Sequence, residues 1–185
     1  STMSCLAETM GLMIPGGATP PAASGARLRI GVETGRLAVK QASIGIPAAE
    51  ILTRKVFENA LTVLAALSGS TNAVVHLQAI AGRVRTQLDL EDFDRISRDI
   101  PLLVDCKPAG SGYMEDFHRA GGIPTLLKVL ESKLNLDVVG VTGESLGEIL
   151  SNVERPGKWQ KIIKSAEDPV GPRGSLVILR GSLAP

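Results

Sequence analysis

The stretch that decides the fold runs Ala49-Glu-Ile-Leu-Thr-Arg-Lys-Val-Phe-Glu-Asn-Ala-Leu-Thr-Val-Leu-Ala-Ala-Leu-Ser-Gly-Ser-Thr-Asn-Ala-Val-Val-His76. Its apolar residues recur at spacings of three and four, which is the pattern of a helix with one buried face. They are Ile51, Leu52, Val56, Phe57, Ala60, Val63, Leu64 and Leu67. The sequence therefore predicts a core helix over residues 48–67 and a second helix over residues 71–84.

Between these helices lies the polar corner Ser68-Gly-Ser-Thr-Asn72. Short polar side chains here can accept hydrogen bonds from the N–H groups that open the next helix. Free N–H groups and the positive end of a helix dipole can also hold a carboxylate or a phosphate. An ordinary N-cap between two core helices is the simpler interpretation, and a ligand-binding corner is the alternative.

The rest of the chain alternates helical patterns with short apolar runs. We expect a loop over residues 15–21, where three prolines and two glycines cannot continue a helix. We expect further helices over residues 3–13, 27–43, 90–98, 113–120, 124–133 and 144–150. Strands are expected over residues 101–105, 137–141 and 175–179. Strands that alternate with helices indicate an α/β fold.

Composition excludes several classes of function. The 185 residues carry 20 Lys and Arg against 19 Asp and Glu, and only 3% are aromatic, so neither a basic nor a base-stacking surface for nucleic acid is expected. No apolar run reaches the roughly 20 residues that a membrane span needs. The two cysteines, Cys5 and Cys106, form no disulfide framework. We expect a cytoplasmic protein that binds neither nucleic acid nor membrane.

Several short sequence motifs, taken in order, resemble those of the dihydroxy-acid and sugar-acid dehydratase family, which includes the phosphogluconate dehydratases. The resemblance covers nearly the whole chain with matching spacing. The words are Leu52–Ala60, Ser68–His76, Asp92–Ser97, Lys107–Gly110, Tyr113–Pro124, Val141–Gly143 and Leu179–Pro185.

The resemblance implies a domain layout. Residues 1–155 correspond to part of a helix-rich N-terminal α/β domain, residues 156–174 to a linker, and residues 175–185 to the first strand of a C-terminal β-barrel domain. In the family a cluster-binding cysteine lies just before the match to Ser1. The chain is thus expected to be an internal segment of a longer enzyme.

The resemblance also implies a reaction. Family members remove water from a 2,3-dihydroxy carboxylic acid and give a 2-keto acid, using an iron–sulfur cluster, of the 2Fe–2S rather than the 4Fe–4S type, and Mg²⁺. Their cluster ligands, metal carboxylates and catalytic serine match no residue here, so no catalytic or metal-binding residue is assigned and this segment alone is expected to bind neither cofactor. A homodimer or homotetramer is expected for the full-length enzyme, with a small-molecule substrate as its ligand.

The resemblance does imply that some residues of this chain lie at one wall of the substrate pocket. Ser70, Thr71 and Asn72 match a word expected at the substrate pocket or just behind it. Residues 1–3 match those that follow a cluster cysteine. The words over residues 15–21 and 113–117 lie slightly closer to the sugar-acid branch than to the branched-chain amino-acid branch.

Other candidate sites have simpler interpretations. Cys106 is expected to be a small buried apolar residue, and His76 a core residue. Glu115 and His118 lie three apart on a helix and could meet at a metal, but an amphipathic helix is the simpler reading. Residues 140–147 lack the glycine pattern of a nucleotide loop and read as a turn into a helix.

Two functions remain open. The first is a part of a hydro-lyase that is inactive alone and catalytic in the full-length chain. The second is a non-catalytic scaffold or interaction segment derived from such an enzyme.

Overall fold

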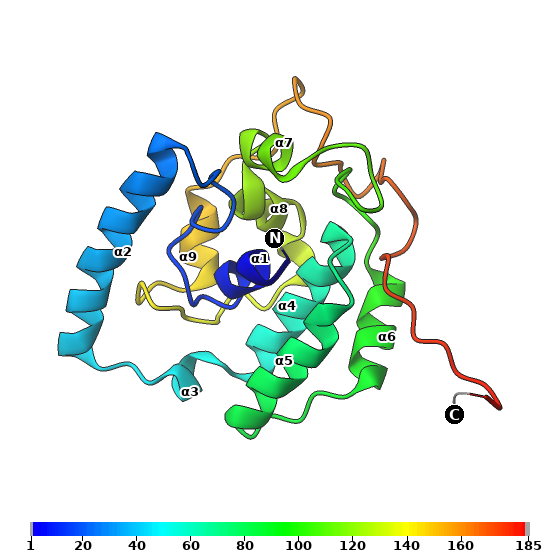
Figure 1. Cartoon of the computed structure of the whole chain (residues 1–185), viewed down its shortest axis with the longest axis horizontal. Helices are drawn as coiled ribbons and strands as arrows, with labels where there is room; N and C mark the ends of the chain where they lie inside the picture. Colours follow the sequence, from blue (N-terminus) through cyan, green and yellow to red (C-terminus); the bar gives the residue numbers. More distant parts are fainter. Residues whose placement is uncertain (1, 184–185) are drawn as a thin grey trace.

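The chain folds as a cluster of helices, and the computed structural model describes residues 2–183 (Figure 1). Ser1 and the last two residues of the expected segment 175–185 lie outside this range. The helices predicted from the sequence are all present in the described part. They are α1 (Thr2–Thr9), α2 (Gly25–Ile44), α3 (Ala48–Ile51), α4 (Arg54–Leu67), α5 (Asn72–Arg83), α6 (Leu90–Asp99), α7 (Met114–Arg119), α8 (Gly122–Val129), the 3-10 helix Glu131–Lys133, and α9 (Leu146–Ser151).

Helix α4 is the centre of the core. Eleven of its 14 residues are buried, and α1, α5 and α6 pack against it. The single helix predicted over residues 48–67 is wrong in one respect, because the chain breaks into α3 and α4. Thr53 adopts an extended conformation between them and is the N-cap of α4. Its carbonyl then accepts hydrogen bonds from the N–H groups of Val56 and Phe57.

Buried Asn59 joins α4 to the segment that follows the 3-10 helix. Its side chain is fully buried. The amide donates to the carbonyl of Asn135 at 3.0 Å and accepts from the N–H of Asn135 at 2.8 Å. One side chain therefore satisfies both backbone groups of a residue that belongs to no helix or strand, as buried backbone groups require.

The predicted strands are wrong as parts of a sheet. In the described residues, the segments 101–105 and 137–141 are extended but form only single bridges, such as Val104 to Ile163 and Val139 to Ser145. The apolar side chains of 101–105 are buried in the helical core, whereas Val139 of the other segment is 44% exposed. The fold of the described residues is therefore helix-rich and lacks the sheet expected of an α/β fold.

Residues 156–183 run along the outer side of this core (Figure 1). The hydroxyl of Ser97 donates to the carbonyl of Leu176 at 2.6 Å, and Gly174 lies so close to Ala65 that an added Cβ would be 2.8 Å from its side chain. Within the described range, residues 175–180 have no strand partner, so the start of a barrel is not seen. No helix among the described residues has the length and apolar character needed to cross a bilayer.

Candidate functional site

The polar corner is a tight turn that closes α4. Ser68 has a left-handed backbone (φ 56°), and the N–H of Gly69 donates to the carbonyl of Leu64 at 3.2 Å. A Cβ at Gly69 would lie 2.4 Å from Cδ1 of Leu64 and 2.7 Å from Cγ2 of Thr2. Only glycine fits at this position without a shift of its neighbours.

The start of α1 supports the corner from the other side. The N–H of Ser70 donates to Oγ1 of Thr2 at 3.0 Å. Thr2 belongs to the segment that the resemblance places after a cluster cysteine, and Ser70 belongs to the word it places at the pocket. The structure therefore brings together two segments that are 68 residues apart in sequence.

The side chains of Ser70, Thr71 and Asn72 are all exposed. Capping differs from the sequence prediction, because Thr71 is the N-cap of α5 and its side chain makes no capping hydrogen bond. Oγ of Ser70 accepts from the N–H of Asn72 instead, at 3.3 Å. Exposed short polar side chains at a helix start can meet a polar or anionic ligand.

The exposed face continues along α5. Asn72, Val75 and His76 lie on one side of the helix, and Val75 is 67% exposed. The prediction that His76 is a core residue is wrong. The α5 residues that do enter the core are Ala73, Leu77 and Ala81, so the helix buries a narrower stripe than its apolar sequence suggests.

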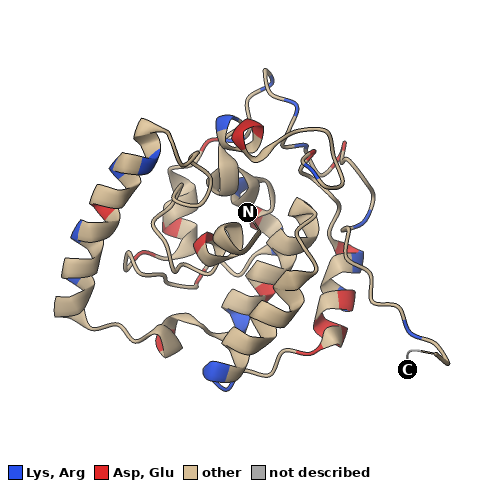
Figure 2. Ribbon diagram, viewed as in Figure 1, with Lys and Arg blue, Asp and Glu red and all other residues tan. Residues whose placement is uncertain are grey.

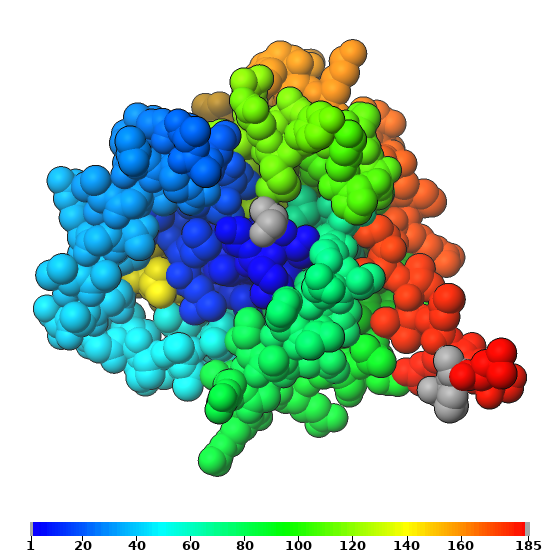
Figure 3. Space-filling model, viewed as in Figure 1, coloured from blue at the N-terminus to red at the C-terminus, as the bar shows by residue number. Residues whose placement is uncertain are grey.

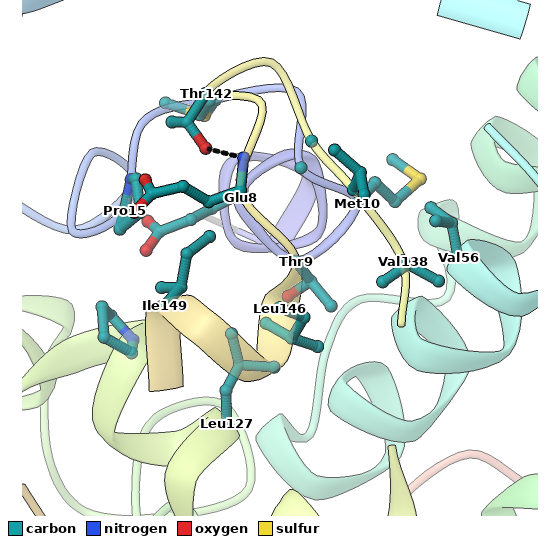
Figure 4. Close-up of a pocket in the computed structure, with 16 residues that line it drawn as sticks. Glu8, Thr9, Met10, Pro15, Val56, Leu127, Val138, Thr142, Leu146 and Ile149 are labelled. Carbon is teal, nitrogen blue, oxygen red and sulfur yellow. Dashed lines mark hydrogen bonds between the residues drawn. The ribbon is translucent and has the colours of Figure 1, made fainter. Parts of the chain in front are cut away.

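A small cavity lies at the other end of α1 (Figure 4). It is a cavity of about 40 Å³ lined mainly by apolar side chains, among them Met10, Val56, Leu127 and Leu146. A space of this size holds a water molecule or two, not an organic acid. We assign it to imperfect packing between α1, α8 and the segment 138–149.

Beside this cavity, Glu8 holds the predicted loop over residues 15–21. Its carboxylate accepts the N–H of Gly16 at 2.6 Å and that of Ala18 at 2.7 Å. Burial raises the pKa of the Glu8 carboxyl to about 6, although the two backbone hydrogen bonds act in the opposite direction.

Arg27, in the first turn of α2, holds the same loop by its carbonyls. Its guanidinium donates to the oxygens of Gly17 at 2.8 Å, Pro20 at 2.7 Å and Ala18 at 3.4 Å. The loop over residues 15–21 is thus held from both sides: Glu8 accepts hydrogen bonds from its N–H groups, and Arg27 donates hydrogen bonds to its carbonyl groups. Sequence reasoning missed this pair because both residues lie in helical patterns that look solvent-facing.

The remaining candidate residues do not converge. His118 is hydrogen-bonded through Nδ1 to Oγ1 of Thr19 at 3.0 Å, while Glu115 pairs with Arg119 at 2.6 Å. Burial raises the pKa of the Cys5 thiol to about 12 and that of the Cys106 thiol to about 11. Among the described residues, no three His, Cys, Asp or Glu side chains are placed to hold a metal ion.

Comparison with known proteins identifies the family. The profile described as "Dihydroxy-acid/6-phosphogluconate dehydratase N-terminal" matches residues 1–149. The chain belongs to this family. It is 44% identical to the dihydroxy-acid dehydratase of Sulfurisphaera tokodaii, and the alignment covers all of this chain and 34% of that protein.

Other curated relatives agree with this assignment. The chain is 42% identical to dihydroxy-acid dehydratase 1 of Nocardia farcinica and 43% identical to the dihydroxy-acid dehydratase of Metallosphaera sedula, over all of its own length in both cases. It spans about a third of the length of these relatives. What is seen here is the corner and helix core of the family's N-terminal region.

Proposed function

We propose that this chain is part of a hydro-lyase that converts a 2,3-dihydroxy carboxylic acid to a 2-keto acid. The observation that carries the proposal is the family match over residues 1–149, together with relatives that are named dihydroxy-acid dehydratases. Those names favour a branched-chain 2,3-dihydroxy acid over a sugar acid as the substrate. The enzyme would work in the cytoplasm, where thiols such as Cys5 and Cys106 stay reduced.

The proposed reaction breaks two bonds on neighbouring carbons. The proton leaves C2 and the hydroxyl leaves C3, together as water, and the resulting enol takes up a proton at C3 to become the 2-keto acid. A base and an acid for the leaving hydroxyl are therefore required, and a substrate carboxylate must be held while they act.

In this proposal the corner formed by Ser70, Thr71 and Asn72 lines the substrate pocket or lies directly behind it. Three features support that role: the side chains are exposed, they open a helix, and Thr2 and Gly69 hold their backbone in place. The positive end of the α5 dipole lies at this corner and favours a negatively charged partner such as a carboxylate.

The described residues do not fit an iron–sulfur cluster or Mg²⁺ by themselves. Both thiols are buried and hard to ionise, and the carboxylates are not grouped for a metal. We propose that in the full-length protein a cluster, of the 2Fe–2S type, and Mg²⁺ are held by residues outside this chain.

The test uses the full-length protein that contains this chain. It should form a 2-keto acid from a branched-chain 2,3-dihydroxy acid, and more slowly or not at all from an aldonate, which is the sugar-acid type of 2,3-dihydroxy acid. Faster turnover of the aldonate would transfer the proposal to a sugar acid. Failure with a panel of both substrate types, in cofactor-loaded protein, would refute dehydratase function and leave the scaffold alternative.

The role of the corner is tested by Asn72→Ala. Loss of one helix-start side chain costs only about 1 kcal/mol in stability, whereas displacement of a pocket wall by about 1 Å can cost about 100-fold in rate. We expect a cooperatively melting protein with sharply reduced turnover. Asn152→Ala is the matched control, since Asn152 is an exposed asparagine at the end of α9. Wild-type turnover with only a lower Tm would show that Asn72 has no role in the pocket.

A further inference from the structure

The loop over residues 15–21 lies in the connection between α1 and α2. Its residues belong to no helix or strand, yet residues 17–20 are buried. Its backbone hydrogen bonds are local: the N–H of Gly17 donates to the carbonyl of Ile14 at 3.0 Å, and the carbonyl of Pro21 accepts from the N–H of Ser24 at 3.0 Å. In the space-filling view α1, this loop and the start of α2 form one continuous blue surface (Figure 3). The loop therefore lies among the helices without sharing their backbone hydrogen bonds.

Side chains from three helices attach the loop to the rest of the chain. Glu8 of α1 accepts two N–H groups of the loop, and Arg27 of α2 donates to three of its carbonyls. From α7, Nδ1 of His118 lies 3.0 Å from Oγ1 of Thr19. The loop can leave these side chains without unwinding any helix. Segments with few backbone hydrogen bonds into the core are the ones that open locally while the rest of a protein stays folded.

Among the described residues, no cation neutralises the carboxylate of Glu8. The residue is only 7% exposed. None of the ion pairs in the described range involves it, and α1 carries no Lys or Arg (Figure 2). A buried charge without a cation is costly, and two N–H donors offset only part of that cost. Burial accordingly raises the pKa of this carboxyl from 4.5 to about 6.

The loop also separates this carboxylate from water. Glu8 and Pro15 both line the cavity of about 40 Å³, whose other walls are mainly apolar (Figure 4). Ala18 of the loop is buried and belongs to the hydrophobic core. Movement of Pro15 and Ala18 away from α1 would open this space and hydrate the carboxylate. Ionisation of Glu8 and opening of the loop are therefore linked by access to solvent.

We propose that the loop over residues 15–21 opens and closes as a unit, and that loss of the Glu8 proton shifts it toward the open form. In the closed form the carboxylate is shielded from water and its proton is held tightly. In the open form the carboxylate is hydrated and ionises at the ordinary pKa of 4.5. The closed form is thus most favoured below about pH 4.5, and this advantage is lost as the pH rises through about 6.

The other ionisable groups around the loop do not provide this link. Arginine stays protonated in proteins, so Arg27 holds the loop equally at each pH. The hydroxyl of Thr19 can donate to a bare ring nitrogen of His118 or accept from a protonated one, so that contact forms in either state. Burial raises the pKa of the neighbouring Cys5 thiol to about 12, which keeps it uncharged. Glu144, at the rim of the same cavity, is already exposed to water when the loop is closed.

The charged residues of the helices that pack on α1 are engaged elsewhere. Helix α1 packs against α4 and α8. The charged side chains of these two helices form ion pairs with one another or with residues beyond α1. The pairs are Arg54 with Glu58 and Asp92, Lys55 with Asp137, and Lys128 with Glu131. Glu8 is therefore the group in these surroundings that links the loop to pH.

The size of the effect follows from the two pKa values of Glu8. With 4.5 in the open form and about 6 in the closed form, the equilibrium constant for opening should rise about 15-fold between pH 4.5 and 7.5. Little further change is expected above pH 7.5, because the carboxyl is by then ionised in both forms.

The test is hydrogen exchange in the full-length protein that contains this chain, read by mass spectrometry of peptides over residues 13–22. Prolines at positions 15, 20 and 21 carry no N–H, so the signal comes mainly from residues 16–19. After division by the intrinsic rate of an unfolded peptide at each pH, exchange should rise about 15-fold from pH 4.5 to 7.5. Peptides from α4 should exchange more slowly and speed up in low urea, whereas a local opening exposes little surface and responds weakly to urea.

Variants separate Glu8 from the rest of the loop. Glu8→Gln removes the ionisable group, so the corrected exchange of the loop should no longer change with pH. Glu144→Gln is the matched control, because it removes an exposed carboxylate from the rim of the same cavity and should keep the rise. If Glu8→Gln does not fold, Arg27→Met carries the test: loss of the carbonyl contacts should speed exchange at every pH and leave the rise of about 15-fold intact.

Three results would overturn the proposal. One is a loop that exchanges at the rate and with the urea response of α4, which excludes a local opening. Another is corrected exchange in the wild type that does not change between pH 4.5 and 7.5. The third is a pH dependence that His118→Gln abolishes and Glu8→Gln does not. No readout uses turnover, so these results do not depend on the proposed reaction.

Discussion

The buried carboxylate of Glu8 makes a quantitative prediction about stability and pH. Its side chain sits beneath the loop over residues 15–21, where burial raises its pKa from 4.5 to about 6. An acid whose pKa is higher in the folded than in the unfolded state binds its proton more tightly when folded. Its contribution is therefore fully present below about pH 4.5 and is lost as the pH rises through about 6.

The size of this contribution to the free energy of unfolding follows from the same two pKa values. A change from 4.5 to about 6 is worth about 2 kcal/mol, which for a chain of this length is about 4–8 °C in Tm. We expect the free energy of unfolding of the wild type, minus that of Glu8→Gln, to fall by about 1.5 kcal/mol of this total between pH 4.5 and 6.5. Glutamine does not titrate and also loses one backbone hydrogen bond, so only the change with pH is predicted and not the offset.

The assay is urea unfolding followed by helical circular dichroism at closely spaced pH values. The exposed Trp159 would be a poor probe of this region. Asp92 does not interfere, because the hydrogen bond from Arg54 lowers its pKa to about 2 and its contribution is lost only in stronger acid. Parallel wild-type and Glu8→Gln curves across this range would refute the reasoning.

Three further predictions concern packing and the thiols. Gly69→Ala should lower the free energy of unfolding by about 1–3 kcal/mol because its Cβ would overlap Leu64 and Thr2, whereas Gly82→Ala should stabilise by up to about 1 kcal/mol; equal effects in urea would contradict this. Asn59→Leu should cost about 1–3 kcal/mol for each backbone group of Asn135 left unpaired, with Asn152→Ala near neutral in the same measurement. Cys5 and Cys106 should not react with a thiol reagent at pH 8 until urea unfolds the chain, and rapid labelling of either would show that the core opens locally.

The helices could be predicted from the sequence because their signals are local. Apolar spacing located α4, and the start of α6 has a local signal too, since Asp89 forms a capping box with Asp92. The sheet was wrong because short apolar runs such as 101–105 are buried in the same way by helices as by strands. The partners of this segment are far away in sequence: Val104 forms a single bridge to Ile163, and Leu102 forms one to Gly171.

The site was only partly predictable for the same reason. The words around Ser70 marked the corner, but nothing local indicated that Thr2 would hold it. Periodicity on α5 did not show that His76 faces outward, because alanines and valines are compatible with either face. The Glu8–Arg27 arrangement needs a loop folded between two helices, and no spacing rule describes that.

The burial of α4 also sets the order in which the chain can finish folding. Its residues are covered by α1 at the start of the chain and, through Ala65, by Gly174 near its end. During synthesis the central helix emerges early but stays partly uncovered until residues about 110 positions later have left the ribosome. The nascent chain should therefore remain sensitive to protease, and a target for chaperones, until residue 176 has left the ribosome.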